Sequence, residues 1–182
     1  FYRKGWRGVN IDPIPGSEKI FQKKRPRDIN IEVGCGAFDS VLEYYQFNDP
    51  ALNTFSSDLA KRRLQSSGKY YLKEVISVRV CPLREILDSV LSANPNLVSS
   101  ETGKGIEFEF LNVDCEGLDF EVLCSNDWER FRPNVVLVEI LKGELYDISE
   151  SDIAQFLSGV GYRLFSKQVN TVLFLDCRNL IG

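Results

Sequence analysis

The chain has 182 residues, enough to bury a substantial core, and we expect one domain over residues 1–182. Its hydrophobic fraction of 43% and charged fraction of 26% are those of an ordinary soluble globular protein. The net charge of −4 leaves no broad basic surface for phosphates, so we predict no nucleic-acid partner. No run approaches the ~18 apolar residues of a membrane span, so we predict no membrane span. The scattered cysteines predict reduced thiols and therefore a cytoplasmic protein.

Two residue types are missing, and the cysteines are scattered. The absence of histidine excludes His-dependent catalytic triads and histidine metal sites. The five cysteines are odd in number and show no C-x-x-C spacing, so we predict reduced thiols and no metal site. Because the chain contains no methionine, we expect that Phe1 is not a translational start and that the chain is trimmed or a fragment.

The first part of the chain alternates apolar segments with turn residues. The predicted elements are a strand over Gly8–Asp12, a helix from about Ser17 to Lys24, and a strand over Ile29–Val33. Residues 38–47 fit either a helix or a strand, because their apolar positions match both periods. Residues 51–73 are polar and predict a loop that carries a short helix around Ser57–Leu64.

The second part continues the alternation. It predicts a strand over Val75–Val80, a helix over Leu83–Leu91 and a surface loop at 92–105. A strand over Ile106–Val113 is then followed by the segment Asp114-Cys115-Glu116-Gly117, a helix through about Arg130 and a strand over Val135–Ile140. The pattern Ser149-x-x-Asp152 indicates a capping box that opens a helix ending near Gly161. Strands over Tyr162–Phe165 and Thr171–Leu175 predict a terminal hairpin.

This order of elements predicts an α/β fold with a Rossmann-like sheet, mostly parallel with a C-terminal antiparallel hairpin. Such sheets bind ligands at the carboxyl ends of their strands, so we expect functional residues just past strand ends.

One interpretation places a cofactor loop at residues 29–36. The stretch Glu32-Val33-Gly34-Cys35-Gly36 has the acid-x-Gly-x-Gly pattern that follows the first strand of S-adenosylmethionine (SAM) methyltransferases. Asp58 would then bind the ribose. Two features count against this interpretation: Phe38 occupies the third glycine position, and Ala51–Ser57 has too few apolar residues for a buried strand.

A second interpretation makes Gly8–Asp12 the strand that binds the ribose. A carboxylate at a strand end suits the two ribose hydroxyls, and Asp12 supplies it. Residues 29–35 then form the neighbouring strand, whose end, with Gly34 and Cys35, lies near the adenine. The glycine loop would precede Phe1 in this interpretation.

Several segments favour the second interpretation through a resemblance. They are Gly5-Trp6-Arg7-Gly8-Val9-Asn10-Ile11-Asp12, Arg25-Pro26-Arg27-Asp28-Ile29-Asn30, Leu52-Asn53-Thr54-Phe55-Ser56, Pro82-Leu83, Leu111-Asn112-Val113-Asp114-Cys115-Glu116-Gly117, Asn126-Asp127-Trp128, Arg132-Pro133 and Val138-Glu139. In this order they resemble FkbM-type SAM-dependent methyltransferases over nearly the whole chain. The resemblance implies a class I methyltransferase fold, N-terminally truncated, whose first strand and glycine-rich loop lie upstream of Phe1.

The truncated sheet would leave a strand position open. Unpaired backbone groups are costly when buried, so we predict either marginal stability or a partner chain that fills the position, as a homo-oligomer could.

The expected chemistry is methyl transfer to a hydroxyl group. In-line displacement depends on positioning and is helped by a base, which in a chain without histidine must be a carboxylate, lysine or tyrosine. We predict Asp114 as the base or positioning acceptor and Glu116 as a second polar contact; the alternative is that both cap the following helix. Asp12, Gly34, Cys35 and Asp114 are the predicted cofactor-binding residues.

Three further residues are predicted to contact the acceptor. Asn53 and Thr54 are candidates for the acceptor pocket or, equally, for loop hydrogen bonds, and Glu139 follows from its place at a strand end. The predicted function is a SAM-dependent O-methyltransferase that acts on a hydroxyl of a sugar, glycan or secondary metabolite. The alternatives are a non-catalytic remnant that serves as a binding module, and a nucleotide or nucleotide-sugar binding Rossmann-like protein that uses Gly34 and Gly36.

Overall fold

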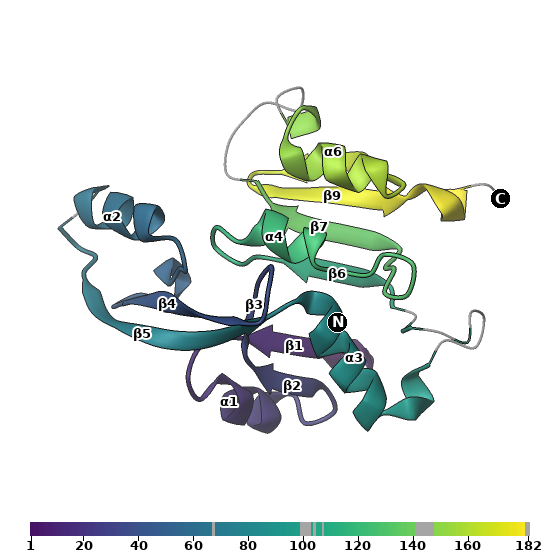
Figure 1. The fold of residues 1–182 in the computed structure, drawn as a ribbon, viewed down its shortest axis with the longest axis horizontal. Helices are drawn as coiled ribbons and strands as arrows, with labels where there is room; N and C mark the ends of the chain where they lie inside the picture. The colour runs from purple at the N-terminus through teal and green to yellow at the C-terminus, as the bar shows by residue number, and fades with distance from the viewer. Residues whose placement is uncertain (67, 99–102, 104, 107, 141–147, 181–182) are drawn as a thin grey trace. The chain divides into compact units, whose positions relative to one another are not determined.

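The computed structural model describes residues 1–66, 68–98, 103, 105–106, 108–140 and 148–180 (Figure 1). The chain divides into two compact units. Unit 1 comprises Phe1–Pro82 and Glu116–Leu118, and unit 2 comprises Leu83–Cys115 and Asp119–Gly182. The organisation as one domain stays a prediction. Among the helices that the structure describes, none is long and apolar enough to cross a bilayer.

The described residues of unit 1 form two small sheets and two α-helices. Its elements are η1 (Tyr2–Lys4), β1 (Val9–Asp12), α1 (Ser17–Lys24), β2 (Ile29–Glu32), β3 (Gly34–Cys35), β4 (Ser40–Phe47), η2 (Pro50–Leu52), α2 (Ser57–Ser66) and β5 (Leu72–Cys81). The ambiguous residues 38–47 contain a strand, β4, because they pair antiparallel with β5 and bury Tyr44 and Phe47. Strand β1 pairs in parallel with β2, and their last residues, Asp12 and Glu32, are partners in the register.

The glycine-containing stretch at 29–36 folds as strands rather than as a loop. Gly34 and Cys35 form β3, which pairs in parallel with the end of β5. A Cβ atom at Gly34 would lie 2.6 Å from Val80 Cγ1 and 2.9 Å from Phe55 Cζ. Gly34 is therefore required for the close packing of β3 against its neighbours, a role that is independent of any cofactor.

In the part of unit 2 that the structure describes, the elements are a four-stranded sheet, three α-helices and short 3-10 helices. Its elements are α3 (Leu83–Ala93), η3 (Pro95–Leu97), β6 (Phe110–Val113), α4 (Asp119–Cys124), β7 (Val135–Glu139), α6 (Asp152–Gly159), β8 (Tyr162–Gln168), β9 (Thr171–Asp176) and η4 (Cys177–Leu180). The strand order is β6-β7-β9-β8. Strands β6 and β7 are parallel, β9 is antiparallel to β7 and β8, and the predicted terminal hairpin is confirmed.

The pairing of strands corrects part of the expected topology. Parallel pairs occur in both units, but antiparallel pairs are as prominent, so the strand pairing as a whole is not mostly parallel. The described β1-β2 sheet is parallel, whereas the other two described sheets are mixed. The structure supports a mixed α/β fold with several sheets.

The predicted strand at 106–113 begins only at Phe110. Ile106 makes isolated bridges to Val98 and Phe131 instead, and residue 107 lies outside the described residues. Part of the predicted loop at 92–105 forms η3, while residues 99–102 and 104 also lie outside the described residues.

Two predicted helix boundaries were wrong. Helix α4 ends at Cys124 rather than near Arg130, because side chains take over the hydrogen bonds of its last turn: Ser125 Oγ donates to Val122 O (2.8 Å) and Trp128 Nε1 donates to Leu123 O (3.0 Å). Helix α6 is capped by Ser151, whose Oγ accepts from the Ala154 amide, and not by Ser149.

A buried ion pair joins the ends of three elements in unit 2. Arg132 Nε and Nη2 donate to the two carboxylate oxygens of Asp176 at 2.6 and 2.7 Å, and Nη1 donates to Val160 O at 2.7 Å. The Arg132 and Asp176 side chains are only 11% and 4% exposed. The Arg132 guanidinium also stacks 4.5 Å from the ring centroid of Tyr162, which lies in the core.

The close approach at Gly34 leads to a stability prediction. Gly34→Ala is expected to lower the free energy of unfolding by about 1–3 kcal/mol, because its methyl group overlaps Val80 and Phe55. Gly36→Ala is the matched control: its Cβ would lie 3.5 Å from Val80, an ordinary contact, so its effect should be clearly smaller. Urea unfolding measures both, and equal effects would contradict the packing role.

The ion pair leads to a pH-dependent prediction. Burial opposes ionisation of Asp176, but the hydrogen bonds from Arg132 and from the Arg178 amide outweigh it and hold the pKa of the carboxyl below its ordinary value of 3.8. The stability from this ionised group is present above pH 3.8 and is lost as the pH falls through the lowered pKa. Asp176→Asn should therefore cost about 3 kcal/mol at pH 7, and this cost should shrink progressively below pH 4.

Chemical denaturation of Asp176→Asn and the parent chain between pH 2.5 and pH 7 measures this difference. Asp58→Asn is the control, because Asp58 pairs with Lys61 on the surface and both side chains are mostly exposed. The control should stay near the parent at every pH. A cost for Asp176→Asn that does not vary with pH would show that the carboxylate charge is not its source.

Candidate functional site

Two adjacent parallel strands of unit 2 end in acidic residues. Asp114 follows β6 directly, and Glu139 is the last residue of β7. The register pairs Val113 with Val138, so the next residues, Asp114 and Glu139, stand level at the carboxyl ends of the two strands. This is the edge at which α/β sheets bind ligands, and both residues were predicted from their places after strands.

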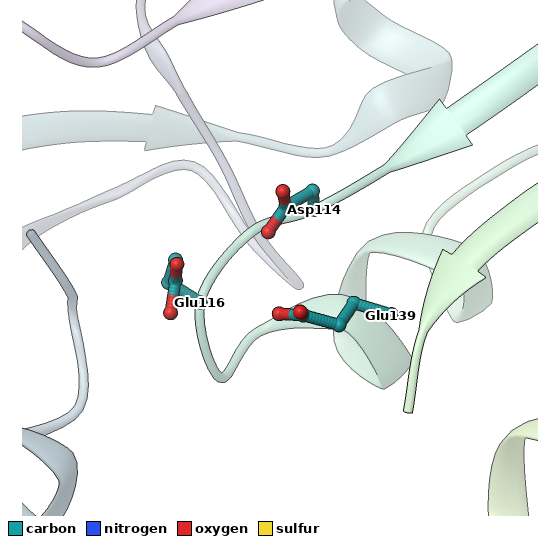
Figure 2. Close-up of side chains that lie close together, drawn as sticks. All are labelled: Asp114, Glu116 and Glu139. Atoms are coloured by element: carbon teal, nitrogen blue, oxygen red, sulfur yellow. The ribbon is translucent and has the colours of Figure 1, made fainter. Parts of the chain in front are cut away.

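Figure 2 shows these two carboxylates with Glu116, from the loop that follows Asp114. Each of the three offers an oxygen atom, and these oxygens lie within 4.8 Å of one another. Asp114 is exposed, whereas Glu116 and Glu139 are half-buried. Such a group can accept protons or hydrogen bonds from a hydroxyl group, and its oxygens could hold a cation. Exposed acidic groups are common without an ion, so we assign no metal here.

The Glu116-Gly117 turn has an unusual backbone. Glu116 adopts φ 48° and Gly117 adopts φ 106°. Glu116 Oε2 forms a very short ion pair with Arg63 Nη2, and the Glu116 carbonyl accepts from Thr54 Oγ1 at 2.5 Å. The carboxylate of Glu116 is thus engaged with helix α2. The alternative drawn from the sequence was that Glu116 caps the helix that follows residue 117, and these contacts do not support it.

Arg63 was not predicted from the sequence as a functional residue. It precedes Glu116 by 53 residues, and no periodic or motif signal links the two positions. The grouping of Asp114 with Glu139 was easier to predict from the sequence, because two successive strands each end in an acid.

Asp12 lies at the carboxyl end of β1, where the ribose-binding acid was expected. Its Oδ1 accepts a hydrogen bond from the Ile14 amide at 2.8 Å, which forms a turn around Pro13. Burial raises the pKa of Asp12 above its ordinary value of 3.8, the Ile14 hydrogen bond opposes the rise, and the nearby charge of Glu32 adds to it. A partly buried acid with a raised pKa at a strand end is typical of functional positions.

The other predicted cofactor residues, Gly34 and Cys35, are buried in β3. Burial raises the pKa of the Cys35 thiol to about 12. The hydrogen bond with the Gly36 amide lowers this pKa in part, and the nearby Cys81 raises it further. Cys35 is therefore a neutral packing thiol at physiological pH, as expected for an inert cysteine. Contact of Gly34 and Cys35 with a cofactor stays a prediction.

The predicted acceptor residues Asn53 and Thr54 are 6% and 0% exposed. Asn53 Oδ1 accepts from the Phe47 amide at 2.9 Å. Thr54 Oγ1 accepts from the Ser56 amide at 2.9 Å in addition to its bond to Glu116. Both side chains make loop hydrogen bonds, the alternative considered from the sequence, and their contact with an acceptor stays a prediction.

A family model matches most of the chain. The model described as the methyltransferase FkbM domain matches residues 1–164, which include Asp12 in unit 1 and Asp114 and Glu139 in unit 2. No curated protein matches the chain, and no solved structure does.

The raised pKa of Asp12 leads to a prediction about stability. A carboxyl whose pKa is raised by folding favours the folded state below pH 3.8 and loses this contribution as the pH rises through its folded pKa. Asp12→Asn can keep the hydrogen bond from Ile14 without carrying a charge. It should therefore be more stable than the parent at pH 7 and no more stable at pH 3.

Urea unfolding at the two pH values measures the effect. Asp49→Asn is the matched control, because Asp49 Oδ1 also accepts from the amide two residues later. An Asp12→Asn variant that is less stable than the parent at pH 7 would refute the inference that the carboxylate is held at a cost.

Proposed function

Because the chain belongs to the FkbM methyltransferase family, we propose that it binds SAM and transfers the methyl group to a hydroxyl of a sugar, glycan or secondary metabolite. The observation that carries the proposal is the placement of acids after parallel strands within the matched residues: Asp12 ends β1, and Asp114 follows β6. Ligands of α/β sheets bind at such strand ends.

The residues of unit 1 fit the nucleoside part of SAM chemically. Ribose hydroxyls donate hydrogen bonds, and a carboxylate accepts them with charge assistance. Asp12 Oδ1 is held by the Ile14 amide, which fixes the orientation of the carboxylate, and we assign Oδ2 to the ribose. The end of β3, with Gly34 and Cys35, is proposed to border the adenine through backbone and apolar contacts.

Asp114 and Glu139 at the ends of β6 and β7, with Glu116 from the turn after Asp114, fit the acceptor side of the reaction. SAM supplies an electrophilic methyl group on a positively charged sulfonium. We propose that Asp114 orients the acceptor hydroxyl and takes the proton that its oxygen loses as the new C–O bond forms. Glu139, level with Asp114 on the adjacent strand, is proposed to contact the acceptor, and Glu116 to provide a second polar contact. Positioning of the oxygen in line with the methyl group supplies much of the rate.

The two alternatives from the sequence differ in what they require. The nucleotide-binding alternative depended on a glycine loop at Gly34 and Gly36, and it is weakened because Gly34 is packed in a strand. The binding-module alternative requires no SAM site, so a direct measurement of SAM binding distinguishes it from our proposal.

The test is titration calorimetry of SAM into the parent chain and into Asp12→Asn. We expect the parent to bind and Asp12→Asn to bind about tenfold more weakly or worse, because a charge-assisted hydrogen bond contributes about 1.5–3 kcal/mol. Asp49→Asn should bind like the parent. Equal affinity in Asp12→Asn would contradict the ribose role, and no binding by the parent would favour the binding-module alternative.

A further inference from the structure

The Glu116-Gly117 turn is held within unit 1 by residues far away in the sequence. Thr54 Oγ1 donates to the Glu116 carbonyl across 62 positions, and Arg63 binds the Glu116 side chain across 53 positions. Thr54 is fully buried, and its hydroxyl also accepts from the Ser56 amide. Thr54 therefore fixes the backbone of the turn, while Arg63 fixes the carboxylate of Glu116.

The backbone of the turn shows why such anchors are needed. Glu116 adopts the left-handed region at φ 48°, which residues with a Cβ atom rarely adopt. Strained conformations of this kind persist where the surroundings over-determine them. Gly117, at φ 106°, packs so closely on α2 that a Cβ would lie 3.0 Å from Leu59 Cδ1 and 3.2 Å from Ser56 Cβ. The turn thus packs closely against the start of α2 and is held there by the contacts of Thr54 and Arg63.

Arg63 is arranged as a two-point clamp. Its Nη2 pairs with Glu116 Oε2, and its Nη1 donates to Leu52 O at 2.7 Å. The side chains of Arg63 and Glu116 are 16% and 24% exposed, so the pair is shielded from water far more than the surface pair of Lys61 with Asp58 on the same helix. A planar guanidinium can satisfy both partners at once, whereas a lysine ammonium lacks this fork.

We propose that Arg63 is a positioning residue for methyl transfer, with Thr54 as its backbone counterpart; this inference rests on the proposed function. By holding Glu116 and the turn that follows Asp114 in the chain, the clamp sets the place of the second polar contact before ligands bind. Glu116 then serves as a fixed, charge-balanced acceptor of hydrogen bonds, and the proton of the acceptor hydroxyl goes to Asp114.

The experiment combines SAM calorimetry with hydrogen exchange at the amides of residues 115–118 in the SAM-free chain. The variants are Arg63→Gln, Arg63→Lys, Glu116→Gln and the double variant Arg63→Gln/Glu116→Gln. The matched control is Arg62→Gln on the same helix, because Arg62 is exposed and its side chain donates only locally, to Asp58 O at 3.3 Å.

We expect Arg63→Gln to accelerate exchange at the turn about tenfold. Because the turn follows Asp114, a predicted cofactor-binding residue, we also expect Arg63→Gln to weaken SAM binding about fivefold to tenfold, with Arg63→Lys intermediate. The double variant should bind SAM no more weakly than either single variant, because coupled residues are not additive. Arg62→Gln should match the parent in both measurements.

The outcomes separate the two proposals. If the parent binds SAM but folded Arg63→Gln binds equally well, Arg63 is only a structural cross-link and the inference is overturned. Unchanged exchange at residues 115–118 in Arg63→Gln overturns it as well, whether or not SAM binds. Failure of the parent to bind SAM overturns the proposed function instead, and faster exchange in Arg63→Gln would still support the clamp.

Discussion

The bidentate ion pair between Arg132 and Asp176 is the interaction on which unit 2 depends most. It joins the segment before β7 to the end of β9, and the same guanidinium holds the carbonyl at the end of α6. Both charges can be buried because the guanidinium donates to both carboxylate oxygens and to a backbone carbonyl. With β7 and β9 fixed in this way at one end, the opposite end of β7 presents Glu139 beside Asp114 in a defined register.

Much of the local structure was predictable from the sequence, because local signals control it. Helix α1 has the predicted bounds, with Pro26 close after its end, and the terminal hairpin follows from two alternating apolar runs. Boundaries set by side chains were missed. The end of α4 depends on Ser125 and Trp128, and the choice between Ser149 and Ser151 as a cap depends on which hydroxyl reaches a free amide. Residue types alone do not specify these contacts.

In the candidate site, too, features set by local sequence were predictable and long-range contacts were not. Acids such as Asp12, Asp114 and Glu139 were identifiable, because each stands where an apolar strand ends. The partner of Glu116 was not identifiable, since Arg63 meets Glu116 only through the fold of unit 1. Residues 38–47 illustrate the limit in another way, because two periods fitted equally well until pairing with β5 decided between them.

The path of the chain through unit 1 has a consequence for its synthesis. Unit 1 is discontinuous: it includes Glu116–Leu118, which follow 33 residues of unit 2. During translation, a nascent chain that has emerged only as far as Pro82 still lacks Glu116, to which Arg63 and Thr54 donate hydrogen bonds. Because domains tend to fold from the N-terminus as they emerge, unit 1 must wait for a later segment before it closes. A fragment that consists of residues 1–82 alone would likewise lack Glu116–Leu118, the last segment of unit 1.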